Sequence, residues 1–285
     1  MLSAYKCLMH SRVQSPSSIN TFKQCPRKYY YQYIARLETK PSIHLLRGEI
    51  VHKVLEEFFQ MSDISDKNFR LKFQMESLSL LQKHWNANLL ELNQLVSSEA
   101  LEFYLHESQL MLLNITETFS KRFERELKKG IGAQAALRVI SPIVEQEFVS
   151  NNLQVRGFMD AIESTDDGVR IMDYKTSKTT EITDPYRLQL AIYALLYEEK
   201  HGKRPDKVGI YFLNASERLL DVTDDLLVLA RTEIAGIHKN TKSEDMKDYP
   251  MKPSRLCKWS TGQCDFFDMC YTKNASQQTL LQIKQ

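Results

Sequence analysis

The sequence predicts an α/β fold, and three observations lead to this prediction. Residues 48–60 and 63–138 carry apolar side chains at helical three- and four-residue spacing. From residue 141 to residue 176 the pattern becomes short, β-branched and alternating, as in strands. Helix and strand patterns then alternate to residue 237. We therefore expect one domain over residues 1–285, with a helical insertion at 63–138 and a cysteine segment at 250–272.

Composition and charge indicate a globular protein that does not span a membrane. The chain has 285 residues, of which 42% are hydrophobic and 26% charged, as in ordinary globular proteins. Its net charge of +2 does not itself indicate a nucleic-acid partner, although basic residues concentrate in positions 1–40. No run approaches the roughly 18 apolar residues that span a bilayer, and the first residues lack an apolar signal core. We expect a cytoplasmic location without a membrane partner.

The N-terminal segment combines cations with aromatic rings. Ser15 is expected to cap a helix, and Pro26 should break that helix or begin a new first turn. Arg27, Lys28 and Tyr29 then begin a tyrosine-rich run. Such mixtures can grip phosphates and stack on bases, so these three residues are candidate nucleic-acid contacts. The alternative is a helix with its rings in the core and its cations directed outward.

The stretch 48–60 predicts an amphipathic helix that buries the apolar residues of one face. This apolar stripe consists of Val51, Val54, Leu55 and Phe58. His52 lies one position off this stripe, and a lone helical histidine is more often structural than a metal ligand. The proline-free stretch 63–138 follows, and Gly130 to Gly132 should end its last helix. Basic residues at 121–129 predict a solvated face, with phosphate contact as the alternative.

Residues 155–176 predict two strands joined by a tight turn at Asp166-Asp167-Gly168. We expect the first strand to end near Asp160. Asp173 and Lys175 are two residues apart in the second strand, so their side chains leave the same face. Paired carboxylates suit Mg²⁺ or Mn²⁺, and a nearby lysine can orient water or stabilise charge on a phosphate. The alternative is a polar hairpin with surface charges.

The flanking elements contain further polar residues. Glu145 and Glu147 lie in a predicted strand beginning near residue 143, and solvent exposure is the simple interpretation. Glu147 could instead approach the metal site. Asp184 should cap a helix that runs to about residue 200. Gln189 and Tyr193 are one turn apart on that helix and share a face. A strand at 207–213 and a covering helix at 219–237 complete the pattern.

Five cysteines are present, and the odd number in a chain without a secretion signal argues against a disulfide framework. Four of them could supply thiolates for an iron–sulfur cluster or structural zinc, and their spacing does not choose between the two. These four are Cys25, Cys257, Cys264 and Cys270. Unconnected cysteines are the remaining alternative, and Cys7 is expected to be a free thiol.

The ordered set of short motifs resembles a known family. G-F-M-D at 157–160 followed by D-Y-K at 173–175 resembles the PD-(D/E)XK nuclease superfamily in its RecB-like branch. The pattern from residue 15 to 34, with C-P-R-K-Y at 25–29, is similar to iron–sulfur members of that branch. These members include the AddB nuclease domain and the CRISPR-associated RecB-like exonucleases. G-x-x-x-H at 48–52 and Q-x-x-x-Y at 189–193 follow the family order.

The resemblance implies a restriction-endonuclease-like core, which is a central mixed sheet flanked by helices. It also implies a Mg²⁺ or Mn²⁺ site, with Lys175 positioning water and offsetting charge in the transition state. Gln189 and Tyr193 would orient the lysine or the strand. The implied metal ligands are His52, Asp160, Asp173 and the carbonyl of Tyr174. A [4Fe–4S] cluster on the four cysteines is implied as well, although six residues separate Cys257 from Cys264, where the family commonly has two.

The function implied by this resemblance is metal-dependent exonuclease action on DNA. Single-stranded DNA and 5′→3′ polarity are the family-level expectations. DNA repair, recombination and CRISPR adaptation are the expected settings, with a helicase or integrase as partner. One alternative is a dormant DNA-binding or structural subunit, which the complete set of Asp160, Asp173 and Lys175 disfavours. Another is a zinc-stapled interaction protein, which metal analysis would separate from the iron form.

Overall fold

The chain divides into two compact units. The computed structural model describes residues 12–260 and 262–271, so Cys7 lies outside the described residues. Unit 1 comprises the described residues of 12–40, 149–156 and 228–271, and unit 2 comprises residues 41–148 and 157–227. Each unit is described by itself. No helix among the described residues is both long and apolar enough to cross a membrane.

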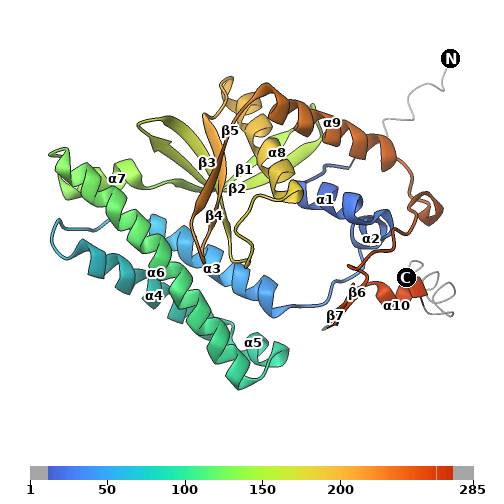
Figure 1. Ribbon diagram of the computed structural model, residues 1–285, viewed down its shortest axis with the longest axis horizontal. Coiled ribbons are helices and arrows are strands. Elements are labelled where there is room, and N and C mark those ends of the chain that lie inside the picture. Colours follow the sequence, from blue (N-terminus) through green and yellow to red (C-terminus); the bar gives the residue numbers. More distant parts are fainter. Residues whose placement is uncertain (1–11, 261, 272–285) are drawn as a thin grey trace, which may run out of the picture. The chain divides into compact units, whose positions relative to one another are not determined.

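A five-stranded mixed sheet forms the centre of unit 2 (Figure 1). The strands lie in chain order: β1 (Ile143–Ser150), β2 (Val155–Thr165), β3 (Gly168–Lys175), β4 (Lys207–Phe212) and β5 (Glu217–Asp221). β2 and β3 are antiparallel, β3 and β4 are parallel, and β4 and β5 are antiparallel. The predicted central mixed sheet flanked by helices is therefore confirmed.

The β2–β3 hairpin turns at the predicted place. Thr165 pairs with Gly168 across the turn, and Gly168 has φ of 108°, a conformation that residues with a Cβ rarely adopt. The prediction that the first strand ends near Asp160 is wrong, because β2 continues to Thr165. The strand continues through the consecutively buried Ala161 and Ile162, which pair with Met172 and Ile171 of β3. Asp160 consequently lies in the middle of β2.

Helices cover one face of this sheet and form the main core. They are α3 (Ile43–Phe59), α4 (Phe69–Ala87), α5 (Leu89–Leu95), α6 (Ser98–Lys128) and α7 (Ala133–Ile140). Phe58, Phe73 and Phe119 join α3, α4 and α6 through ring contacts of 5.1–5.8 Å between centroids. Met172 and Tyr174 of β3 belong to the same buried cluster. The stripe predicted for α3 is buried throughout.

Helix α8 (Asp184–His201) connects the parallel strands β3 and β4 and contacts both. Its N-cap is Thr183, not Asp184 as predicted, and the helix ends at Gly202, which has φ of 65°. The covering helix predicted at 219–237 is present, but its predicted start is wrong. Residues 217–221 form β5, because pairing with β4 overrides their helix-like apolar pattern. Helix α9 (Asp224–Asn240) begins only after this strand.

Unit 1 contains α1 (Pro16–Gln24), α2 (Pro26–Tyr29) and a π-helix (Tyr30–Ile34). Ser15 and Ser18 form a capping box at α1, and Pro26 begins α2, so both N-terminal predictions are confirmed. The buried Tyr29 ring stacks on Tyr249 at 6.1 Å. The remaining elements are most of α9, η2 (Met246–Asp248), β6 (Lys258–Trp259), β7 (Gly262–Gln263) and α10 (Phe267–Tyr271).

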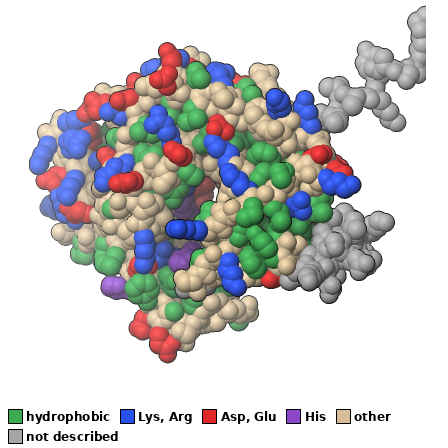
Figure 2. All heavy atoms as spheres, turned by 45° about the vertical axis from the view of Figure 1, so that its right-hand side comes forward, with side chains coloured by type: hydrophobic (Ala, Val, Ile, Leu, Met, Phe, Trp, Pro, Cys, Tyr) green, Lys and Arg blue, Asp and Glu red, His purple; other side chains and the backbone are tan. Residues whose placement is uncertain are grey.

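Charged side chains on α6 are largely paired. Lys121 lies 3.4 Å from Glu117, and Lys128 lies 3.1 Å from Glu124. Figure 2 shows basic and acidic side chains intermixed on the visible face, most densely at its left. This pairing supports a solvated face for the basic run at 121–129.

Candidate active site

Asp160 sits where β2 and β3 separate. Their backbone ladder ends at the pair of Ala161 and Met172. One residue further, Asp160 Oδ2 accepts a hydrogen bond from the backbone N–H of Tyr174 at 2.7 Å. The carboxylate thus accepts the hydrogen bond that a backbone carbonyl of a neighbouring strand would otherwise accept. This contact fixes Asp160 beside the end of β3, where Asp173 and Lys175 lie.

Asp173 and Lys175 share one face of β3, as their spacing predicts. Lys175 Nζ lies 2.6 Å from Asp173 Oδ2. On the other oxygen, the Gln189 side chain donates a hydrogen bond to Asp173 Oδ1 at 2.8 Å. The same amide donates to the Tyr193 hydroxyl at 2.7 Å. The motif residues of α8 and β3 therefore form one connected polar group.

His52 reaches this group from α3. Its Nδ1 lies 3.5 Å from Asp160 Oδ2. Burial lowers the pKa of His52, although the charge of Asp173 opposes that shift. A lowered pKa keeps the imidazole neutral near pH 7, which is the form that ligates metals.

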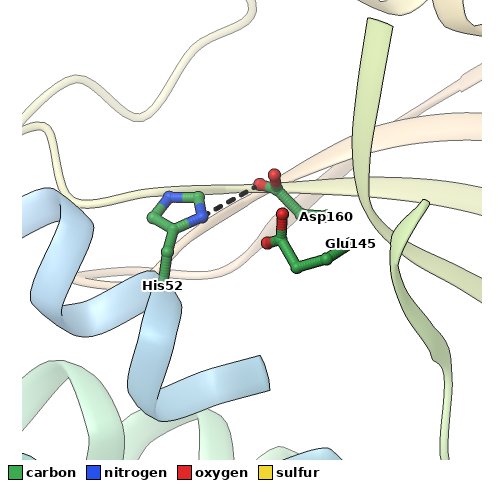
Figure 3. A group of neighbouring side chains, drawn as sticks. All are labelled: His52, Glu145 and Asp160. Atoms are coloured by element: carbon green, nitrogen blue, oxygen red, sulfur yellow. Dashed lines mark ion pairs between the residues drawn. The ribbon is translucent and has the colours of Figure 1, made fainter. Parts of the chain in front are cut away.

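Glu145 completes a group that sequence reasoning did not assemble. One ligand atom each from His52, Glu145 and Asp160 lies within 4.8 Å of the other two (Figure 3). Glu145 is exposed, as expected, but its carboxylate points toward Asp160. Glu147, the alternative weighed for the metal site, is outside this group. Strand alternation places both glutamates on one face, so the sequence carried no signal that distinguishes them.

Burial and neighbouring negative charge raise the pKa of two of the carboxylates, Asp160 and Glu145. Burial and then the charge of Asp173 raise the pKa of Asp160 well above its usual value. Although Glu145 is exposed as a residue, its carboxylate is partly desolvated, and this desolvation, followed by the charges of Glu56 and Asp173, raises its pKa. Burial would lower the pKa of Lys175, but the charges of Asp173 and Asp160 outweigh it and raise the pKa. The site therefore gathers more negative charge than Lys175 neutralises, and this excess favours cations.

The donor set fits a hard divalent cation. Carboxylate oxygens with an imidazole nitrogen suit Mg²⁺ and especially Mn²⁺. The buried Asp173 Oδ2 accepts no geometrically regular hydrogen bond from the described residues, and its close neighbour is the Lys175 ammonium, in an ion pair at 2.6 Å. A cation at this oxygen would share it with the Lys175 ion pair. The Tyr174 ring is buried against Phe59 at 5.9 Å, and its carbonyl stays a predicted ligand.

The cysteines form a second site, within unit 1. Cys25 lies between α1 and α2, and Cys270 lies on α10. Cys257 and Cys264 flank the β6–β7 hairpin, where Cys264 N–H donates to the Cys257 carbonyl at 2.9 Å. All four cysteines line one pocket. The hairpin therefore brings the two cysteines together despite the six residues between them.

The electrostatics of this pocket suit a thiophilic centre. Burial, and next the negative charge of Cys25, raise the pKa of Cys270 to about 11. Each thiolate makes it harder for its neighbours to lose a proton, and a bound metal ion or cluster removes this repulsion. Four such cysteines therefore suit an iron–sulfur cluster or a zinc ion. Arg27 partly opposes the pKa shift of Cys270.

The three candidate nucleic-acid contacts, Arg27, Lys28 and Tyr29, all contact other residues of unit 1. The Arg27 guanidinium donates to the carbonyl of Tyr249 at 2.7 Å. Lys28 lines the cysteine pocket. Tyr29 is fully buried, and its hydroxyl pairs with Gln14 at 3.0 Å. The structure therefore assigns Tyr29 to the core of unit 1 and not to a base-stacking surface.

Comparisons with known proteins identify a family for this chain. The family model described as the PD-(D/E)XK nuclease superfamily matches residues 14–271. The chain is 30% identical over 103 residues to an ATP-dependent helicase/nuclease subunit of Thermoanaerobacter sp. (strain X514), a match covering 34% of this chain and 8% of that protein. It is 23% identical over 154 residues to the CRISPR-associated exonuclease Cas4 of Francisella tularensis subsp. novicida, covering 54% of this chain and 75% of that protein.

Among solved structures, a candidate exonuclease from Eubacterium rectale aligns with a TM-score of 0.48 and 14% identity, over 95% of this chain and 98% of that chain. The family match alone covers nearly the whole described chain and includes every residue of both sites. It confirms the resemblance drawn from the ordered motifs. The chain belongs to the PD-(D/E)XK nuclease superfamily.

Proposed function

We propose that this protein is a divalent-metal-dependent deoxyribonuclease that degrades single-stranded DNA from its ends. The observation that supports this proposal is the meeting of Asp160, Asp173 and Lys175 where β2 and β3 separate. Two carboxylates beside an ammonium match the chemistry of phosphodiester hydrolysis, which needs a cation site and a positive donor near the phosphate. A dormant subunit has no chemical requirement for this complete set.

Each residue has a proposed role. Asp160, Asp173, neutral His52 and the Tyr174 carbonyl would hold the cation. A bound Mg²⁺ or Mn²⁺ supplies Lewis acidity, which stabilises charge on the phosphoryl group and lowers the pKa of water. Lys175, held by its ion pair with Asp173, would orient the attacking water and offset charge developing on the phosphate.

The polar residues of α8 would preserve this arrangement. Gln189 holds Asp173 Oδ1 and the Tyr193 hydroxyl together. With one oxygen of Asp173 fixed in this way, its other oxygen stays directed toward Lys175. We assign Gln189 and Tyr193 as positioning residues, because their contacts reach the proposed cation and phosphate only through Asp173.

The test is cleavage of end-labelled single-stranded DNA with Mg²⁺ or Mn²⁺, comparing the wild type with Lys175→Ala. Wild type should cleave, and the variant should lose at least about 100-fold in rate. The matched control is Lys129→Ala, which also removes one positive charge but pairs with Glu126 and Asp166. Labels at the 5′ and 3′ ends give polarity, and 5′→3′ action is the expected result. Equal rates in wild type and Lys175→Ala would reject the assigned role.

Inactive wild-type protein with its cysteine site loaded would instead favour a binding subunit or a requirement for a partner. Two controls make that outcome interpretable. A gel-shift assay with the same DNA reports binding without cleavage, and a double-stranded substrate tests the strand preference. Binding without cleavage in both metals would move the assignment to the dormant DNA-binding subunit.

We also propose that Cys25, Cys257, Cys264 and Cys270 hold a [4Fe–4S] cluster. The shared pocket and the adjacent positions of Cys257 and Cys264 support this assignment. Zinc is the competing occupant, because four thiolates suit it equally. Anaerobic purification followed by iron, sulfide and zinc analysis separates the two, since about four iron atoms and four sulfides per chain are expected for the cluster. A content of one zinc atom per chain would instead assign the four cysteines to a structural zinc site.

A partner and a biological setting are also proposed. The matched stretch of the helicase/nuclease subunit suggests that a DNA helicase supplies the single strand, and an integrase is the corresponding partner in CRISPR adaptation. DNA repair and recombination are the other proposed settings, and a cytoplasmic location is proposed with them. Co-purification with a tagged chain would identify the partner, and recovery of neither class would reject this part of the proposal.

A further inference from the structure

The trio of His52, Glu145 and Asp160 differs from the ligand set that the sequence motifs imply. The trio draws on three separate elements, α3, β1 and β2, whose side chains converge on one point (Figure 3). We propose that Glu145 is a ligand of the divalent cation at this site, together with His52 and Asp160. This inference rests on the proposed function and adds to it a residue that no motif in the sequence indicates.

The distances within the trio suit a bound cation. An octahedral ion whose ligands lie at about 2.1 Å requires ligand atoms roughly 3 Å apart in adjacent positions and roughly 4.2 Å apart in opposite ones. The three ligand atoms already lie within 4.8 Å of one another, and His52 Nδ1 lies 3.5 Å from Asp160 Oδ2. Small side-chain rotations would therefore close the set around an ion.

The Glu145 carboxylate also has fewer existing contacts than the carboxylate of the predicted ligand Asp173. Asp173 contacts Lys175 with one oxygen and Gln189 with the other. Among the described residues, the Glu145 carboxylate has no hydrogen bond and no ion pair, and Lys53 acts on it only as a more distant positive charge. A carboxylate without such a partner, facing a histidine and an aspartate, can join a cation without first breaking a contact.

The backbone at Glu145 gives independent support for a specific orientation. Its φ is 49°, in the left-handed region that a strand residue with a Cβ rarely adopts. Unusual backbone of this kind recurs in strands beside functional sites, where it redirects one side chain. In this chain the redirected side chain is the one that meets His52 and Asp160.

Direct Mn²⁺ binding tests this assignment without requiring nuclease activity. Mn²⁺ is titrated into the full chain, purified with its cysteine site loaded and without DNA, and free Mn²⁺ is measured by electron paramagnetic resonance. Glu145→Gln should weaken binding at least about 10-fold. The matched control is Glu147→Gln, which makes the same change two residues along β1 and should bind like the wild type. Wild-type affinity in Glu145→Gln would overturn the proposal, as would an equal loss in Glu147→Gln.

A second variant separates metal binding from folding. Glu145→Gly removes the carboxylate but tolerates φ of 49°, so its metal-free melting temperature should not fall below that of the wild type. Its Mn²⁺ affinity should fall as in Glu145→Gln. Wild-type affinity in this folded variant would also overturn the proposal.

The two hypotheses fail in distinguishable ways. If the wild type cleaves DNA but Glu145→Gln retains its Mn²⁺ affinity, the nuclease proposal stands and the ligand assignment is wrong. If the wild type does not cleave DNA but needs Glu145 to bind Mn²⁺, the ligand assignment stands and the nuclease proposal fails.

Discussion

The side-chain amide of Gln189 donates a hydrogen bond to Asp173 Oδ1 at 2.8 Å, which links the N-terminal part of α8 to the end of β3. Asp173 is buried, and Lys175 occupies its other oxygen. One amide therefore helps fix the carboxylate on which the lysine depends. This relationship makes the α8 residues positioning elements whose loss should be measurable.

Gln189→Ala should lower the cleavage rate about 10- to 100-fold, because outer partners of metal-site residues commonly contribute that much. Mn²⁺ affinity without DNA should fall in parallel, which a loss of DNA contact alone would not cause. Gln82→Ala, in which the lost partner is the exposed Asn86, serves as the control. Unchanged Mn²⁺ affinity in Gln189→Ala would show that Asp173 does not need this hydrogen bond.

Gly157→Ala should disturb the same region from β2. A Cβ built at Gly157 would lie 2.9 Å from Tyr193 Cε1 and 3.2 Å from Leu196 Cδ1. Displacing this packed ring should cost about 1–3 kcal/mol of unfolding free energy and reduce cleavage. Gly236→Ala is the matched control, because its Cβ meets nothing within 4 Å and alanine favours a helix. Equal stability of the two variants in urea would contradict the steric argument.

Arg47 should contribute to both stability and activity. Its guanidinium lies 2.6 Å from Glu107 on α6 and donates to the Thr176 carbonyl, directly after Lys175, at 3.2 Å. The side chain is only 4% exposed, so Arg47→Ala should cost about 3 kcal/mol in urea unfolding.

Arg70→Ala provides the contrast for this prediction. Arg70 also pairs with α6, but its side chain is 42% exposed, so solvent screens the pair and its loss should cost much less than the loss of Arg47. Activity should fall only in the Arg47 variant, at a temperature where both remain folded. Similar small losses in both variants would remove Arg47 from this role.

Asp160 should make the metal-free protein less stable as pH rises. Burial and the charge of Asp173 raise its folded-state pKa above the usual 3.8. The folded state therefore binds this proton more tightly than the unfolded chain. Its contribution to stability is complete below pH 3.8 and is lost as pH rises through the raised pKa.

Asp160→Asn should remove that dependence and be more stable than wild type at neutral pH in EDTA, by about 0.5–2 kcal/mol. Melting temperatures across the acid to neutral range check the sign. Added Mn²⁺ should stabilise the wild type but not the variant, because only the wild type keeps the ligand. A variant less stable than wild type in EDTA at every pH would contradict the electrostatic argument.

Cys264→Ser should release the proposed cluster and lower the thermal stability of unit 1. Cys264 and Cys257 meet across the β6–β7 hairpin, so removing one thiolate breaks a paired set of ligands. Iron content and visible absorbance should fall together. Cys7→Ser, outside the described residues, should leave both unchanged. Full iron content in Cys264→Ser would exclude this cysteine as a ligand.

The sequence by itself predicted the family, the mixed sheet and the order of its motifs. It could do so because Asp173 and Lys175, or Gln189 and Tyr193, are close in sequence and share a face through local periodicity. Local turn and capping preferences likewise predicted the turn before Gly168 and the helix cap at Ser15. The errors arose where pairing between strands overrode the local sequence pattern. β5 forms by pairing with β4, although its apolar pattern suggested a helix.

Only the tertiary structure decided which glutamate joins the site. Glu145 and Glu147 have the same charge and the same strand phase, so local rules treat them alike. The unusual backbone at Glu145 and the packing of α3 near β2 brought one of them to His52 and Asp160. The β6–β7 hairpin likewise closed the gap between Cys257 and Cys264. Contacts between segments far apart in the chain depend on backbone path and packing, which periodicity does not encode.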